Sequence, residues 1–189
     1  APLRGSSGIG HTRWATVGRP SVENAHPHLD CTGRIAIVHN GDIENYAPLR
    51  ERLKDQGHQF HSDTDSEVLA HLIEIHAGDG IARAVAQALQ EVEGSYALAT
   101  LDRDSDFLVL ARRESPMVVG LGQGENFVAS DAPAILENTR EIVYLEDGDL
   151  AVLSPERLQL WHGEAPATRR VPHIAWSPRD LDKAGYDHF

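Results

Sequence analysis

Eleven residues near the start of the chain, GHTRWATVGRP (10–20), carry side chains suited to holding a carboxylate. Arg13 presents a planar guanidinium whose paired N–H donors match the two oxygens of a carboxylate. Thr16 adds a hydroxyl donor three residues later, and Trp14 lies between them. The type and spacing of these residues predict a carboxylate grip made by Arg13 and Thr16.

Three further polar residues could complete a site for an amino acid. Asn40 and Gly41 follow a short apolar stretch, and such a pair can present a side-chain amide beside a backbone N–H, as an oxyanion hole requires. Taken alone, the pair is an ordinary turn signal. Asp65 could accept from an ammonium group or cap the helix that follows it. Together these groups indicate a site for an amino acid whose side-chain carbonyl is attacked.

Two other clusters give weaker signals. His26 and His28 flank a proline, so their rings do not turn easily onto one ion, and no third ligand stands at a recognisable spacing. We therefore expect neither a metal site nor a cofactor. Cys31 is the only cysteine and lies in a polar turn where nothing nearby in the sequence lowers its pKa. We expect it to be a loop residue rather than a nucleophile.

Composition limits the partners and the compartment. The chain has 189 residues and a formal net charge of −12, which disfavours nucleic acid and anionic membrane surfaces as partners. A single cysteine forms no internal disulfide, and no apolar run is long enough to span a bilayer. These features predict a cytoplasmic protein with one main domain.

The elements that must position these residues follow from hydrophobic periodicity. Helical spacing predicts helices at 46–56, in the residues after 62–65 and at 81–92, with a short helix at 132–138. The stretch after 65 has an apolar face of Val68, Leu69, Leu72 and Ile75. Alternation predicts strands at 34–39, 95–102, 106–112, 117–122, 126–130, 141–145 and 149–154.

The grouping of these elements predicts the fold class. Helices come first and strands follow with short turns, which favours α+β layers with antiparallel pairing. The glycines of GLGQGEN (120–126) precede no helix and no Lys-Ser/Thr pair, so they predict a hairpin rather than a phosphate loop. After Trp161 the chain becomes polar and rich in proline, as a linker leaving the domain would be.

Six motifs in one order resemble a known family. They are GHTRWATVG, NAHPH, VHNGDIEN, SDTDSEV, RRESPMVVGLGQGENFVASD and LEDGDLAVL. The chain closely resembles the glutaminase domain of the glucosamine-6-phosphate synthase (glutamine:fructose-6-phosphate aminotransferase) family, a class II glutamine amidotransferase. The amidotransferase domain of amidophosphoribosyltransferase is the alternative, and the Trp of HTRWAT and the HNGDIEN motif favour the first.

The resemblance implies a fold and a domain organisation. The family fold is the N-terminal-nucleophile hydrolase sandwich, with four layers in the order αββα and antiparallel sheets. It implies an amidotransferase domain over residues 1–163 that is incomplete at its N-terminus. Residues 164–189 would be a linker towards a sugar isomerase domain of the same parent chain. A homodimer would form through that second domain.

The resemblance also implies roles for the substrate-binding residues. Arg13 and Thr16 would hold the α-carboxylate of L-glutamine, and Asp65 would hold its α-ammonium group. Trp14 would cover the site and the route by which ammonia leaves. His26 lies in a segment near the site with a structural or gating role.

Catalysis would use Asn40 and the Gly41 amide as the oxyanion hole. The family nucleophile is an N-terminal cysteine upstream of the Arg-Trp motif, and Cys31 does not match its position. This implies that the 189 residues alone are inactive in glutamine hydrolysis, and a nucleophile-free glutamine-binding or interaction module is the alternative. Val17 departs from the family, which has histidine there.

Overall fold

Two antiparallel sheets pack face to face in the computed structural model, which describes residues 5–174. The large sheet contains, in spatial order, β1 (His28–Leu29), β2 (Ile35–Asn40), β3 (Tyr96–Asp102), β4 (Leu108–Arg113), β8 (Asp149–Leu153), β9 (Leu158–His162) and β10 (Ala165–Ala167). The small sheet contains β6 (Asn126–Ala129), β5 (Val118–Leu121) and β7 (Glu141–Tyr144).

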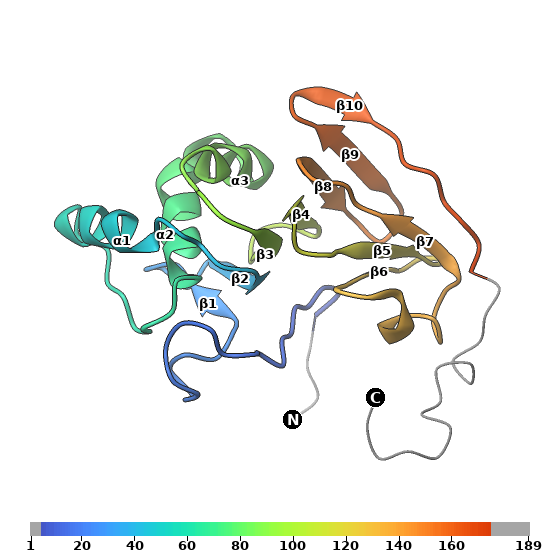
Figure 1. Ribbon diagram of the computed structural model, residues 1–189. Coiled ribbons are helices and arrows are strands. Elements are labelled where there is room, and N and C mark those ends of the chain that lie inside the picture. The colour runs from blue at the N-terminus through green and yellow to red at the C-terminus, as the bar shows by residue number, and fades with distance from the viewer. Residues whose placement is uncertain (1–4, 175–189) are drawn as a thin grey trace, which may run out of the picture.

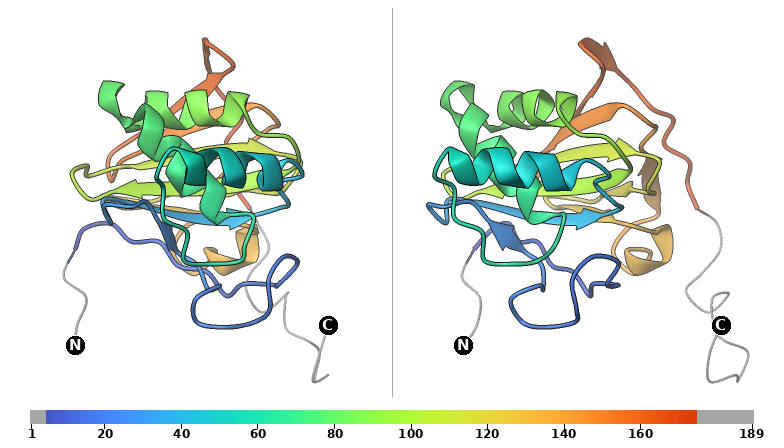
Figure 2. Two further views of the ribbon diagram at one scale, coloured as in Figure 1. Left: turned by 90° about the vertical axis from the view of Figure 1, so that its left-hand side faces the viewer. Right: turned by 60° about the vertical axis from the view of Figure 1, so that its left-hand side comes forward.

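Three helices cover one face of the large sheet, and the small sheet lies on its other side (Figure 1). They are α1 (Tyr46–Asp55), α2 (Glu67–His76) and α3 (Ile81–Gln90), and the short 3-10 helix η1 (Ala77–Asp79) links the last two. The two further views show the N-terminal segment, residues 5–27, running below the large sheet (Figure 2). No described helix is both long enough and apolar enough for a membrane span.

Alternation along the strands produces two separate cores. In β3, Leu98 packs towards the helices, whereas Ala97 and Ala99 pack towards the small sheet. Successive side chains of a strand point to opposite faces, so one strand contributes to both layers. The predicted α+β class with antiparallel pairing is therefore observed, and residues 120–126 form the predicted hairpin between β5 and β6.

Helix α2 is more deeply buried than its predicted apolar face. Val68, Leu69 and Leu72 are buried as expected, but Ile75 is 43% exposed and Ile73 is fully buried in its place. The prediction for Ile75 was wrong because α2 is covered on more than one side, by α1, α3 and strand β2. A single-face periodicity does not describe such a helix.

The fourth layer of the predicted αββα sandwich, on the outer face of the small sheet, contains little helix in the described residues. The predicted helix at 132–138 is only a 3-10 turn, η2 (Ala132–Ala134), which begins where the Asp131 side chain accepts from the Ala132 N–H. The chain then bends so that the neighbouring residues Ile135 and Leu136 are both buried against the small sheet. The backbone bonds here join residues three apart, from the Ile135 N–H to the Ala132 carbonyl and from the Asn138 N–H to the Ile135 carbonyl, so the chain forms tight turns in place of the predicted helix.

The predicted linker begins too early at residue 164. Strand β10 pairs with β9 as the edge strand of the large sheet, and Pro166 sits within it. Proline is tolerated at a sheet edge, because the missing N–H faces outward there. Further on, His173 bridges to Glu141 and Ile174 is buried, so the domain continues to at least residue 174. The rest of the predicted linker, 175–189, lies outside the described residues.

Gly94, between α3 and β3, lies against the turn that follows β2. Its φ is 109°, and an added Cβ would lie 2.2 Å from the Asp42 carbonyl oxygen. Gly57 has a similar φ of 96° with open space around it. We expect Gly57→Ala to cost about 1 kcal/mol of unfolding free energy, for the left-handed backbone alone. Gly94→Ala should cost at least about 2 kcal/mol more, because backbone must move.

Urea denaturation of the two variants measures this difference. Equal losses of stability at the two glycines would show that the contact between residues 94 and 42 is not tight.

Candidate functional site

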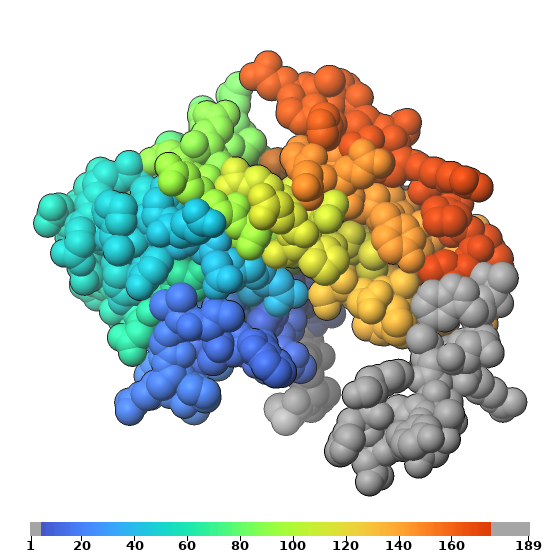
Figure 3. Space-filling view, in the orientation of Figure 1, coloured from blue at the N-terminus to red at the C-terminus, as the bar shows by residue number. Residues whose placement is uncertain are grey.

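A pocket of about 170 Å³ lies where the N-terminal segment meets the end of β2 and the loop before α2. All of the site residues predicted from the sequence line it: Arg13, Trp14, Thr16, His26, Asn40, Gly41 and Asp65. The N-terminal segment forms the lower margin of the molecule, against the cyan part of the chain (Figure 3). The fold therefore brings together residues separated by up to about fifty positions.

Arg13 organises the loop on which it lies. Its backbone has a positive φ of 50°, and its Nη2 donates to the carbonyls of Val17 at 2.9 Å and Gly18 at 3.0 Å. Nη1 donates to the Arg19 carbonyl at 3.1 Å. A guanidinium has five N–H groups, so Nε–H and one Nη1–H remain for a ligand. Val17 contributes to this loop through its backbone carbonyl, which any residue type supplies.

The other two predicted residues of the loop face solvent. Trp14 is 92% exposed at the edge of the pocket, and Thr16 is exposed as well. An indole left in water at the mouth of a polar pocket retains a large apolar surface that a ligand could cover. The loop therefore presents Trp14 and Thr16 around the opening rather than inside it.

Asn40 is oriented by His11, a residue that the sequence analysis missed. The Arg13 backbone N–H donates to His11 Nδ1 at 2.9 Å, so that nitrogen must be the unprotonated one in the neutral ring. His11 Nε2 then carries the proton and donates to Asn40 Oδ1 at 2.8 Å. This bond turns the Asn40 NH₂ group away from His11, so the amide can act as a donor.

Gly41 is required by the shape of the turn that follows Asn40. Its φ is 128°, and a Cβ there would lie 2.2 Å from the Ser95 carbonyl oxygen. Only glycine adopts this backbone without displacing Ser95. The turn therefore holds the backbone of residue 41 close to the side-chain amide of Asn40.

Asp65 is a buried acceptor and does not cap α2. Its side chain is 4% exposed, and Oδ2 accepts from the Ile43 backbone N–H at 2.8 Å. The alternative role as a helix cap is wrong, because the Glu67 N–H donates instead to Thr64 Oγ1, at 3.4 Å. Ser66 Oγ donates to Asp65 Oδ1 at 3.5 Å. A buried carboxylate on the pocket wall suits a cationic group.

Three histidines in or beside the pocket are held in the neutral form. Burial lowers the pKa of His26 to about 2, and the neighbouring His28, His11 and His39 and Arg13 lower it further. Burial likewise lowers the pKa of His28 to about 4 and lowers the pKa of His39. His26 stacks on His11 with ring centroids 4.3 Å apart, and its Nδ1 accepts from the His39 N–H. These contacts make His26 a support for His11.

A larger cavity of about 420 Å³ adjoins the pocket at Asn40. It shares His11, His39 and Asn40 with the pocket and extends between the two sheets to Met117 and Val128. The amide of Asn40 is therefore reached from two sides. A ligand in the pocket could be approached by a second group from the space between the sheets.

One cluster of possible metal ligands occurs in the described residues, and it does not line the pocket. It contains Cys31, His58, His71 and Glu74. His26 and His28, which prompted the question of a metal in the sequence, have ring centroids 4.5 Å apart in an edge contact. Burial and the neighbouring carboxylate of Glu74 raise the pKa of Cys31, so this thiol is not activated as a nucleophile.

Comparison with known proteins gives one family. A family model described as the glutamine amidotransferase domain matches residues 11–137. Two curated proteins named glutamine–fructose-6-phosphate aminotransferase [isomerizing] are similar to the whole chain. They come from Methanothermobacter thermautotrophicus, at 48% identity, and Thermus thermophilus, at 47%. The chain covers 32% and 31% of them, so it spans about a third of the length of these relatives.

Solved structures support the same fold. The glutamine phosphoribosylpyrophosphate amidotransferase from B. subtilis aligns with a TM-score of 0.68 and 26% identity, over 82% of this chain and 34% of that one. A glutamine aminotransferase class-II domain protein from Silicibacter pomeroyi aligns with a TM-score of 0.54 and 22% identity, over 78% and 74% of the two chains. These similarities confirm the predicted antiparallel α+β sandwich.

The neutral histidines make the stability of the protein sensitive to acid. A histidine has a pKa near 6.5 in the unfolded chain, whereas that of His26 is about 2 and that of His28 about 4 in the folded protein. The unfolded chain therefore binds more protons below pH 6.5. Their contribution to stability is complete above that pH and is lost as pH falls towards 4, by at most about 1.4 kcal/mol per pH unit for each histidine.

We therefore expect His28→Gln to flatten the fall in melting temperature between pH 7 and pH 5. Glutamine can still donate to Thr64 Oγ1, which His28 Nε2 meets at 3.0 Å. His61→Gln, at an exposed side chain, is the matched control and should keep the native pH dependence. The account of the histidines fails if both variants follow the same curve in a thermal melt.

Proposed function

The chain belongs to the glutamine amidotransferase family, and on that premise we propose that it binds L-glutamine in the pocket beside Asn40 and takes part in its hydrolysis to glutamate and ammonia. The observation that carries the proposal is the convergence in one pocket of a guanidinium, a buried carboxylate and an oriented amide. These are complements of the carboxylate, ammonium and side-chain carbonyl of one amino acid.

The two ends of the pocket fit the two charges of the substrate. Arg13 retains two N–H groups for the α-carboxylate, and the Thr16 hydroxyl can add a third donor. The buried Asp65 carboxylate has a single short hydrogen bond, from the Ile43 N–H, and can accept from the α-ammonium group. Trp14 would cover the bound amino acid, consistent with its exposed position at the opening.

The reaction would develop negative charge next to Asn40. A thiolate attacks the side-chain amide carbon, the carbonyl oxygen becomes an oxyanion, ammonia leaves, and water then releases glutamate. The Asn40 NH₂ group, turned outward by His11, and the Gly41 N–H are the proposed donors to that oxyanion. His26 would support this arrangement by stacking on His11.

Cys31 is not the proposed nucleophile. It does not line the pocket, and it is the only cysteine of the 189 residues. We assign the nucleophile to a cysteine outside these residues, as the family resemblance implies, with its α-amino group as the base. Such an amine has a pKa of about 8, suited to catalysis near neutral pH. The 189 residues would then bind glutamine without hydrolysing it.

The proposed use of the ammonia is the conversion of fructose 6-phosphate to glucosamine 6-phosphate. It rests on the names of relatives that are 44–48% identical, compared with 26% for the phosphoribosylpyrophosphate amidotransferase structure from B. subtilis. The sugar chemistry would lie in a sugar isomerase domain of the same parent chain, through which a homodimer would form. A single cysteine supports a reducing cytoplasm as the location.

Asp65→Asn in the full-length gene product tests the ammonium site. Asparagine keeps an acceptor for the Ile43 N–H but removes the charge that would hold the ammonium group. We expect the KM for glutamine to rise about 10- to 100-fold, the range for a lost charged hydrogen bond. Asp63→Asn, two residues earlier and exposed, is the matched control. Steady-state glutaminase assays giving the same KM for both variants would place the ammonium group elsewhere.

His11→Leu tests the orientation of Asn40. We expect kcat to fall about 10- to 100-fold, with a smaller rise in KM from the lost bond to the Arg13 N–H. This loss of kcat is smaller than the 100- to 1,000-fold seen when an oxyanion donor is removed. His11→Gln should recover part of kcat, because its amide N–H can donate to Asn40 Oδ1. A matching rise in KM in His11→Leu, or no difference between the two variants, would contradict a positioning role for His11.

A further inference from the structure

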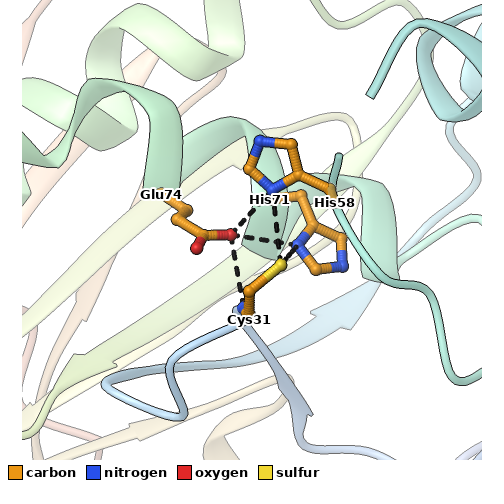
Figure 4. Close-up of side chains that lie close together, drawn as sticks. All are labelled: Cys31, His58, His71 and Glu74. Atoms are coloured by element: carbon orange, nitrogen blue, oxygen red, sulfur yellow. Dashed lines mark hydrogen bonds and ion pairs between the residues drawn. The ribbon is translucent and has the colours of Figure 1, made fainter. Parts of the chain in front are cut away.

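Four side chains from three separate segments meet on one side of α2. Cys31 lies in the turn between β1 and β2, His58 in the loop after α1, and His71 and Glu74 one turn apart on α2. One atom of each, the Cys31 sulfur, Nδ1 of both histidines and Glu74 Oε2, lies within 4.8 Å of the other three. In the close-up these atoms point towards a common centre (Figure 4).

Four of the six distances between these atoms are close to those between the ligands of one tetrahedral metal ion. The Cys31 sulfur is 3.5 Å from Nδ1 of His58 and 3.5 Å from Nδ1 of His71. A sulfur about 2.3 Å and a nitrogen about 2.0 Å from zinc, at the tetrahedral angle, lie about 3.5 Å apart. Glu74 Oε2 is 2.9 Å and 3.1 Å from the same two nitrogens, a few tenths of an ångström below the corresponding separation of about 3.3 Å.

His71 has the surroundings of a metal-bound histidine. The side chain is fully buried, and its second nitrogen, Nε2, has no hydrogen-bond partner but faces Glu67 Oε1 at 3.9 Å. The Glu67 carboxylate is itself fixed by the backbone N–H groups of His61 and Ser62, at 2.8 Å each. With a metal on Nδ1 the proton would lie on Nε2, and the Glu67 carboxylate behind that nitrogen would favour this tautomer.

The remaining contacts of the cluster also favour a cation at its centre. One oxygen atom, Glu74 Oε2, makes three hydrogen bonds: with Nδ1 of His58, with Nδ1 of His71 and, at 3.2 Å, with the Cys31 N–H. The Gln59 N–H approaches the Cys31 sulfur at 3.5 Å, a contact that stabilises a thiolate. In the metal-free protein both imidazoles must carry a proton on Nδ1 to satisfy the carboxylate. A single divalent ion would replace these protons and bind all four groups.

We propose that Cys31, His58, His71 and Glu74 form a structural Zn²⁺ site. Thiolate, imidazole and carboxylate are the ligands that zinc takes in proteins, and four protein ligands leave no open position for a substrate. The site clamps the turn after β1 and the loop after α1 onto α2. None of its ligands lines the pocket at Asn40, so the proposal is independent of glutamine binding.

Titration of the protein with Co²⁺ tests the proposal, because Co²⁺ substitutes for zinc and a cobalt–thiolate bond absorbs in the near ultraviolet. We expect one equivalent of Co²⁺ to give this band and Zn²⁺ to displace it. Cys31→Ser should abolish the band and lower the Zn²⁺ affinity at least about 100-fold, the upper end of what a lost supporting contact costs. His58→Gln should also weaken binding, whereas His76→Gln is the matched control.

The thermal melt gives a second measurement. Zn²⁺ should raise the melting temperature of the native protein and of His76→Gln, but not that of Cys31→Ser. His76 lies two residues after Glu74 but contacts Glu91, at 3.0 Å, so it shares the helix and not the cluster. Co²⁺ binding without the thiolate band, or equal Zn²⁺ affinity in the native protein and Cys31→Ser, would overturn the proposal.

Discussion

The hydrogen bond between His11 and Asn40 joins the N-terminal segment to the end of β2. Around it, the Arg13 N–H fixes the His11 tautomer, and the Arg13 guanidinium closes the loop that carries Trp14 and Thr16. No described strand precedes β1, so the segment is held by polar contacts of this kind and by Ile9, which packs against the core between the sheets. The shape of the pocket therefore depends on the two hydrogen bonds that the His11 ring makes, one to Asn40 and one from the Arg13 backbone.

Helix α2 provides the second fixed point. The residues just before it place Asp65 in the pocket wall, where the carboxylate accepts from the backbone of Ile43. The following turns carry His71 and Glu74 of the proposed zinc site. A metal bound there would hold α2 in the position that aims Asp65 at a ligand. Substrate binding and metal binding would then act on one rigid helix from opposite ends.

The sequence predicted the central strands better than the strand at the edge of the large sheet. Alternation located the central strands such as β3, where the side chains of residues 96–99 point in turn to one core and to the other. It failed at β10, because Pro166 resembles a linker residue until its place at a sheet edge is known. Residue types and the family motifs identified the pocket residues. They missed His11, whose role depends on a tautomer set by a backbone N–H. They also missed the Cys31 cluster, because its ligands come from three separate segments and only His71 and Glu74 are close in sequence.

A crystal structure of the protein with bound L-glutamine would show which groups hold each end of the amino acid. We expect the α-carboxylate on Arg13 and Thr16, the α-ammonium group on Asp65, and the side-chain carbonyl oxygen within hydrogen-bond distance of Asn40 Nδ2 and the Gly41 N–H. This expectation includes the bond between His11 and Asn40, which should persist. Glutamine bound in the opposite orientation, or in the cavity between the sheets without contact to Arg13 and Asp65, would contradict it.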